Sequence, residues 1–269
     1  NKSVTNAKIE LIDNSNTNCG YSNTKNDGVA TITPTDYSAF HVVFNGNDSY
    51  YSSKTLENIN YQFADIYVST SGSDSNNGLT QDTAVATLSK AIELVSTGGT
   101  IGLLNGTYTL TAMITFDKAC TIKGQSESGV IINEGNNEYA TIYNGTGTLT
   151  VSNCTFTTSS DGGIVNYSTG TVSATNCTFT SHEYGLSNVK NGTVTATNCT
   201  FISNSGGIVN HSTGTVSATN CTFISNDEGG VESYGVGTLT VTNCTFTSNG
   251  SYDVAVIDSG TTILHCNTY

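Results

Sequence analysis

The sequence predicts an all-β protein in which a right-handed parallel β-helix forms the C-terminal three quarters of the chain. Six of the eight cysteines, from Cys154 to Cys266, follow one another at intervals of 23, 22, 22, 23 and 22 residues. Around the first five, the chain repeats one pattern, which reads GTLTVSNCTF in its first copy and GTVSATNCTF in its second. A fixed period of this length indicates a solenoid, and Thr- and Val-rich segments between Gly and Asn corners favour one β-coil per repeat, about nine coils in all.

The order of residues within one repeat assigns their sides. Alternation along a strand points Leu149 and Val151 inward and the threonines between them outward. Asn153 takes a corner, since Asn tolerates the left-handed backbone of a tight bend, and Cys154 and Phe156 then point inward. A leucine-rich repeat would need a leucine signature and a helical segment, and a propeller blade would need about twice this length.

Stacked coils place like residues over like and therefore predict three ladders. We expect the asparagines to bond amide to amide inside the coil, out of reach of N-glycosylation, so that Asn47, Asn105, Asn144 and Asn249 would be better acceptors. Stacked cysteines would lie about 4.8 Å apart, beyond the roughly 3.8 Å between Cβ atoms that a disulfide prefers, so we expect free, buried thiols. The ladder residues are Asn153, Asn176, Asn198, Asn220 and Asn243; Cys154, Cys177, Cys199, Cys221 and Cys244; and Phe156, Phe179, Phe201, Phe223 and Phe246.

Two segments precede the regular repeats, which begin near residue 146. Residues 1–64 form a separate β module, with strands expected at KIELID, GVATITP, FHVVF and NINYQF. Residues 65–110 form a capping segment at the start of the β-helix, which covers residues 65–269. Its stretch from Ala84 to Val95 places Leu88, Ala91 and Ile92 on one face and predicts a helix that covers the open end of the core.

These motifs resemble those of a known group of proteins. The segment from Ile66 to Leu110 and the NCTF repeats are similar to pectate-lyase-like β-helix proteins, and together they resemble the adhesin-like surface proteins of methanogenic archaea. Residues 1–64 also resemble an immunoglobulin-like β-sandwich module in the segments Asp27 to Thr31 and Phe44 to Ser52. Because 64 residues are short for a complete sandwich, we expect the module to be incomplete, with its first strand missing or supplied from elsewhere. The resemblance implies an extracellular chain at the cell surface that attaches to cells or glycans.

Three further roles are kept as alternatives, one of which is a polysaccharide-active β-helix enzyme. The chain could be a structural spacer or a filament subunit that self-associates head to tail through an open C-terminal coil. The outward Thr-x-Thr pattern, such as Thr193 with Thr195, also resembles the threonine arrays of ice-binding β-helices.

Charge and composition limit the partners. The formal net charge is −13, and all eight basic residues are lysines, because the chain contains no arginine. Such a surface is a poor partner for phosphate backbones, so we expect no nucleic-acid binding, and it also argues against acidic polysaccharides. No apolar run approaches the roughly 18 residues of a membrane span.

Catalytic and metal signals are weak. Enzymes with this fold use clustered aspartates, usually with an arginine, whereas the acids of these repeats are scattered through variable loops. His41, His182, His211 and His265 have no partner at ligand spacing, and the run from Asp74 to Gly78 reads as a turn rather than a calcium loop. We therefore expect no catalytic residue, no metal site and no cofactor.

One row of outward residues suggests binding. At the outward positions of the third strand of each repeat, Tyr167, Val189, His211 and Tyr234 should form an exposed row, with Val165, Val209 and Glu232 beside it. Exposed tyrosines stack well on sugar rings. The candidate binding residues are Tyr167, His211, Glu232 and Tyr234.

Overall fold

The computed structural model describes residues 8–13, 18–23, 40–44, 54–59, 63–133, 135, 142–145, 147–157, 162–258 and 260–269. The chain divides into two compact units, residues 1–63 and 64–269. No helix in the described part of the chain has the length and apolar character needed to cross a bilayer.

The described strands of the first unit form one antiparallel sheet with the order β2-β1-β3-β4. They are β1 (Lys8–Asp13), β2 (Asn18–Asn23), β3 (Phe40–Phe44) and β4 (Lys54–Ile59). The predicted strands KIELID and FHVVF are β1 and β3, whereas β2 was not predicted. The end of β4 overlaps only the first two residues of the predicted strand NINYQF, Asn58 and Ile59. The predicted strand GVATITP and the segments Asp27 to Thr31 and most of Phe44 to Ser52 lie outside the described residues, and the immunoglobulin-like assignment stays a prediction.

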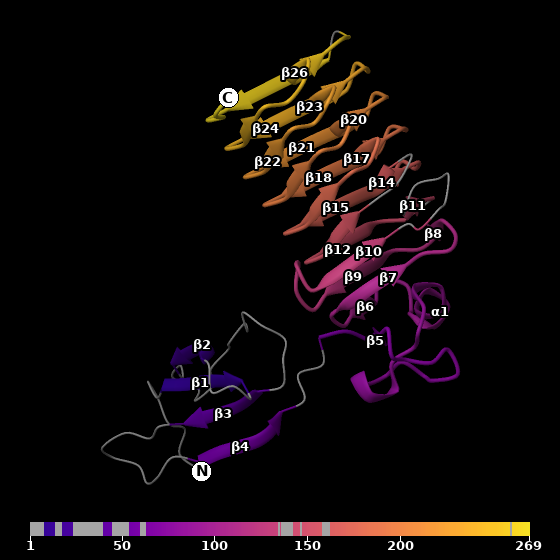
Figure 1. Ribbon diagram of the computed structural model, residues 1–269, viewed down its shortest axis with the longest axis vertical. Helices are drawn as coiled ribbons and strands as arrows, with labels where there is room; N and C mark the ends of the chain where they lie inside the picture. The colour runs from indigo at the N-terminus through magenta and orange to yellow at the C-terminus, as the bar shows by residue number, and fades with distance from the viewer. Residues whose placement is uncertain are drawn as a thin grey trace. The chain divides into compact units, whose positions relative to one another are not determined.

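The second unit is a solenoid of three parallel sheets, whose strands stack in chain order (Figure 1). The first sheet has nine strands, and the second and third have seven each. The solenoid therefore has seven complete turns with one extra first-sheet strand at each end, and the expectation of nine coils was wrong because the segment after the first strand folds as a cap.

The strand bounds follow this three-fold order. The first sheet contains β5 (Ile66–Val68), β6 (Thr100–Leu103), β9 (Cys120–Gly124), β12 (Leu149–Ser152), β15 (Thr171–Thr175), β18 (Thr193–Thr197), β21 (Thr215–Thr219), β24 (Thr238–Thr242) and β27 (Thr261–His265). The second contains β7 (Gly106–Thr109), β10 (Val130–Asn133), β13 (Thr155–Thr157), β16 (Thr178–Thr180), β19 (Thr200–Ile202), β22 (Thr222–Ile224) and β25 (Thr245–Thr247). The third contains β8 (Ile114–Phe116), β11 (Ile142–Asn144), β14 (Gly162–Asn166), β17 (Tyr184–Asn188), β20 (Gly206–Asn210), β23 (Gly229–Ser233) and β26 (Tyr252–Val256).

The phenylalanine ladder forms as predicted. The five rings from Phe156 to Phe246 are buried, and successive ring centroids lie 5.0, 5.1, 4.9 and 4.9 Å apart with nearly parallel planes. Tyr269 adds a sixth ring, 5.4 Å from Phe246. Strand register alone produces this stack, because Phe156 pairs with Phe179 and Phe179 with Phe201 across parallel strands.

The cysteine ladder also forms, with free thiols. All five members are buried, and each Sγ donates to a carbonyl oxygen two residues earlier, as from Cys154 to Ser152 at 3.3 Å. Burial raises the pKa of the Cys154 thiol to about 12. These side chains therefore act as small apolar residues rather than as nucleophiles.

The corner asparagines behave only partly as predicted. All five have positive φ, and the amides of Asn153, Asn176, Asn198 and Asn220 bond successively at 3.3 Å. Their ladder lies on the outside of the corner, however, and Asn198, Asn220 and Asn243 are exposed. The following cysteine occupies the inward position, so the corner side chain faces solvent and is not shielded as expected.

The internal amide ladder is a different one. Asn144, Asn166, Asn188 and Asn210 are fully buried on the third sheet, and their amides bond successively at 3.0, 3.1 and 3.0 Å. The expected glycosylation acceptor Asn144 is therefore inaccessible, whereas Asn47 lies outside the described residues. The second N–H of each buried side-chain amide also needs an acceptor. For Asn188, Nδ2 donates this second hydrogen bond to the Gly192 carbonyl oxygen at 3.1 Å.

The cap consists of a 3-10 turn, η1 (Gln81–Thr83), and the helix α1 (Leu88–Leu94). Leu88, Ala91 and Val95 pack into the core, as the predicted apolar face requires. The helix begins at Leu88 rather than at Ala84 because Val85 pairs with Val68 as a parallel bridge and Thr87 caps the helix through the Lys90 amide. Asp74 lies in a turn, as predicted.

Candidate functional site

The outer face of the third sheet carries the predicted binding row. Strand register arranges its outward residues in three columns, because each strand pairs in parallel with the next. The first column is Gly162, Tyr184, Gly206, Gly229 and Tyr252; the second is Val165, Ser187, Val209, Glu232 and Ala255; the third, directly after the strands, is Tyr167, Val189, His211, Tyr234 and Ile257. We call Tyr184, His211, Glu232 and Tyr234 the outer aromatic face.

The His211 ring contacts two tyrosine rings of this face. The His211 ring stacks on Tyr234 with centroids 5.8 Å apart and planes 7° from parallel, and Tyr184 meets His211 edge-on at 5.4 Å. Tyr234 is 39% exposed and His211 is also exposed, so one side of the cluster is open to solvent. Partial burial lowers the pKa of His211, which keeps its ring neutral at neutral pH.

Tyr184 was missed in the sequence. Its ring lies across Gly206, where a Cβ atom would come within 3.1 Å of Tyr184 Cδ1 and 2.8 Å of Val209 Cγ2. The missing side chain of Gly206 makes the room for the ring. The sequence signal was a tyrosine between two glycines, Gly162 and Gly206, in the same column, but an irregular strand start obscured the alternation at this position.

Glu232 lies in the site but is not exposed as predicted. Its side chain is only 2% exposed, and Val209 beside it is fully buried, because the rings of Tyr184 and Tyr234 flank the middle column. The Tyr234 hydroxyl donates a hydrogen bond of 2.7 Å to Glu232 Oε2, whereas Oε1 has no hydrogen-bond partner in the described part of the chain. Burial raises the pKa of Glu232, and the bond to Glu232 raises that of Tyr234 to about 12.

Tyr167 lies apart from this cluster. It is 43% exposed, as predicted, but Val189 occupies the rung between it and His211. The ammonium group of Lys190 lies 4.8 Å from the Tyr167 ring centroid. A cation–π contact of this kind occupies one face of the ring and leaves Tyr167 a weaker candidate than the other three residues.

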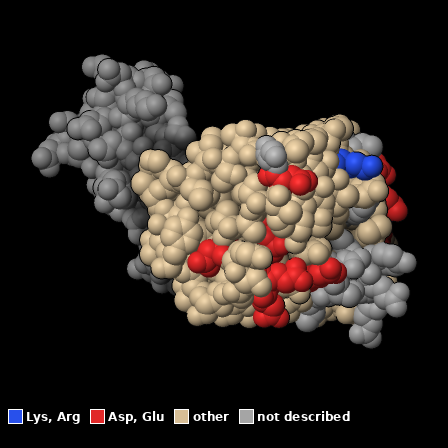
Figure 2. Space-filling view, turned by 90° about the horizontal axis from the view of Figure 1, so that it is seen from above, with Lys and Arg blue, Asp and Glu red and all other residues tan. Residues whose placement is uncertain are grey.

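The surroundings of the face are acidic. From residue 191 to the end of the sequence there is no lysine or arginine, whereas Asp227, Glu228, Glu232, Asp253 and Asp258 lie in that span. Seen from above, several acidic side chains lie close together in the lower part of the view, others lie apart from them, and most of the surface in view carries no charge (Figure 2). Among the described residues, no three His, Cys, Asp or Glu side chains come together as a metal site would need. The arrangement can stack on a ring and exchange hydrogen bonds with hydroxyl or ammonium groups.

The comparison with family models adds to this geometry. The model of the right-handed β-helix region matches residues 103–269. The chain belongs to this family. The right-handed β-helix is thus shown for the repeats, and the match begins within the predicted capping segment.

Two solved structures are similar to this chain in fold. Pectin methylesterase PemA from Erwinia chrysanthemi is similar over 71% of this chain and 70% of that chain, with 15% identity and a TM-score of 0.52. A rhamnogalacturonan lyase is similar over 74% of this chain and 62% of that chain, with 17% identity and a TM-score of 0.44. At such identities the likeness shows the fold alone. No curated protein matches the sequence.

Proposed function

We propose that this β-helix is a non-catalytic, extracellular adhesin-like module that binds glycans through its outer aromatic face. The observation that carries the proposal is the contact cluster of Tyr184, His211 and Tyr234, with centroids 5.4 and 5.8 Å apart and one side open to solvent. Aromatic planes bind the apolar faces of sugar rings, and preformed rings lose little conformational entropy on binding. Glu232 fixes the Tyr234 hydroxyl and so holds the Tyr234 ring in place.

The charges around the face favour neutral or amino sugars over acidic ones. Glu183 and Glu228 both act on Tyr184, whose pKa is raised first by burial and then by Glu183. A uronic acid placed there would meet like charge, while the Lys190 ammonium lies over the Tyr167 ring, apart from the cluster, so binding would lose energy. The ligand we propose is therefore a neutral glycan or one that carries an ammonium group.

Extracellular display and adhesion rest on the resemblance of the cap and the NCTF repeats to adhesin-like archaeal surface proteins. In such a location, burial and a raised pKa would protect the ladder thiols from oxidation. A surface module also needs no catalytic group.

A polysaccharide-active enzyme is the competing function, because the outer face contains a buried carboxyl group paired with a tyrosine. The chain has no arginine to stabilise an anionic substrate. Methanol release from pectin, or loss of polymer length, would be measured with the intact chain and with Glu232→Gln. Turnover by the intact chain would overturn the non-catalytic proposal, and its loss in Glu232→Gln would place the catalytic site at the outer aromatic face.

A spacer or filament subunit is the alternative that we propose, and the exposed apolar side chains in and after β27 that could join two copies are Ile263, Leu264 and Tyr269. End-to-end contact of two copies would bury these apolar side chains. Sedimentation and electron microscopy at high concentration test it, with Leu264→Lys as the disrupting variant. A strict monomer that binds glycans would leave the adhesin proposal standing alone.

A glycan array combined with whole-cell binding tests the main proposal. We expect Tyr184→Ala and Tyr234→Ala each to weaken the best glycan at least tenfold. Tyr269→Ala, which removes an exposed tyrosine ring outside the outer aromatic face, is the control and should bind normally. Unchanged binding by the double variant Tyr184→Ala, Tyr234→Ala would exclude this face as the site.

A further inference from the structure

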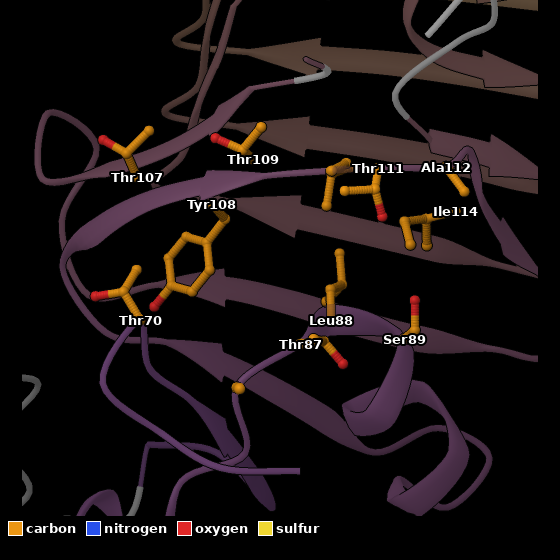
Figure 3. A pocket seen from close by; sticks show the side chains of 12 residues that line it. Thr70, Thr87, Leu88, Ser89, Thr107, Tyr108, Thr109, Thr111, Ala112 and Ile114 are labelled. Carbon is orange, nitrogen blue, oxygen red and sulfur yellow. The ribbon is translucent and has the colours of Figure 1, made fainter. Parts of the chain in front are cut away.

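A cavity of about 380 Å³ lies at the start of the solenoid, away from the outer aromatic face. Strand β7 and the residues after it form one edge, and Thr70 with the segment Ala86 to Ser89 forms the opposite edge (Figure 3). Nothing in the sequence indicated this cavity, because it arises where the cap replaces strands of the second and third sheets.

The cavity borders an unpaired strand edge. In the second sheet β7 is the terminal strand and pairs only with β10 among the described strands. The Gly106 amide donates to Gly129 at 2.8 Å and the Leu110 amide to Asn133 at 2.7 Å. Because the direction of backbone groups alternates along a parallel strand, the amides and carbonyls of Thr107 and Thr109 point the other way, towards the cavity.

The floor of the cavity is apolar and fixed. Leu88, Tyr108, Leu110 and Ile114 are buried members of the core. The Tyr108 hydroxyl lies 2.6 Å from the Leu104 carbonyl oxygen and 3.0 Å from that of Val68, so its ring cannot turn freely.

The opposite edge is also fixed. Asp74 Oδ1 accepts hydrogen bonds of 2.9 Å from the amides of Ala86 and Thr87, and the Thr87 hydroxyl donates to Asp74 Oδ2 at 2.8 Å. These bonds lower the pKa of Asp74, and they hold its exposed carboxylate against the backbone of Ala86 and Thr87. The cavity is therefore preformed, which reduces the entropic cost of binding.

The rim offers hydrogen-bonding groups without charge. Five exposed residues on the two edges carry hydroxyl groups that make no hydrogen bond to the part of the chain that the structure describes. These residues are Thr70, Ser89, Thr107, Thr109 and Thr111. No charged side chain lines the cavity. A ligand needs an apolar face for the floor and both donors and acceptors around its edge.

We propose that this cavity binds a neutral saccharide of one or two pyranose rings. A pyranose combines an apolar face of C–H groups with a rim of hydroxyls that donate and accept. A carboxylated sugar would bury a charge with no cation to pair it. An extended peptide fits less well, because the free edge offers the backbone of only two residues, and strand addition depends on several such bonds.

The test is an NMR titration of the intact chain with cellobiose, lactose, maltose and mannobiose, and with digalacturonate as the acidic counterpart. We expect at least one neutral disaccharide to shift the Thr107 and Thr109 amide resonances, and digalacturonate to bind at least tenfold more weakly. Ala112→Trp, which fills the cavity from its exposed rim, should abolish the shift. Thr200→Val, on the outer side of the same sheet, is the control and should bind normally.

Tyr184→Ala separates this site from the outer aromatic face and should leave the Thr107 and Thr109 shifts intact. The proposal is overturned if none of the four neutral sugars shifts these amides, if Ala112→Trp binds as the parent chain does, or if digalacturonate binds equally well. It is also overturned if only an extended peptide, acetyl-Thr-Val-Thr-Val-Thr-amide, produces the shift.

Discussion

Removal of one ring from the middle of the phenylalanine ladder should destabilise the solenoid more than any surface change. Phe201 is fully buried and stacks on Phe179 at 5.1 Å and on Phe223 at 4.9 Å. A buried Phe→Ala substitution costs about 3–5 kcal/mol, and each aromatic pair adds about 0.5–1.5 kcal/mol to plain burial. Because Phe201 loses two stacked partners, we expect Phe201→Ala to lower the free energy of unfolding by about 5 kcal/mol.

Urea denaturation followed by circular dichroism measures this loss. Thr200→Ala, one residue earlier and facing outward, is the matched control and should cost within about 1 kcal/mol. Phe201→Leu keeps most of the volume but removes the stacking, so its cost should fall between the two. Equal costs for Phe201→Ala and Thr200→Ala would refute an in-register ladder.

Three further predictions concern titration and reactivity. His182 is buried, and burial lowers its pKa to about 4, so its ring is neutral in the folded chain at neutral pH. Its contribution to stability is therefore present above pH 6.5, and about 3 kcal/mol is lost as pH falls towards 4. His182→Asn, which installs the residue found at the equivalent position 204, should abolish that slope in pH-dependent unfolding, and an unchanged slope would contradict the assignment. Burial raises the folded-state pKa of Glu232, so its contribution to stability is present at acid pH and is lost as pH rises through that pKa. The stability of the parent chain relative to Glu232→Gln should therefore fall as pH rises above the ordinary pKa of a glutamate, and a rise would show that the carboxylate is favourably paired. Iodoacetamide should label the exposed Cys266 in the native chain but none of the five ladder cysteines, as read by mass spectrometry, and labelled ladder thiols would mean that the turns open.

The repeated elements could be predicted because each follows from spacing alone. One cysteine and one phenylalanine per period, on alternating strand positions, fix both the register and the buried side, and the structure confirms both. The side of Asn198 was predicted wrongly, because a corner residue obeys no alternation and its neighbour Cys199 already fills the inward position.

The site depends on contacts that spacing does not encode. Alternation correctly placed Tyr167 and Tyr234 on the outer face, but it could not show that the Tyr184 ring lies across Gly206. Glu232 therefore becomes buried although its position faces outward. The cavity beside β7 escaped prediction for a related reason, since it depends on where the cap interrupts the strands.

The most direct test of the glycan-binding account observes the histidine at the centre of the outer aromatic face. In a carbon–proton NMR spectrum of the histidine side chains, the best glycan from the array should shift the His211 resonances, while the buried His182 should not respond. If that glycan binds and the His211 resonances stay in place, ligand recognition does not occur at Tyr184, His211 and Tyr234.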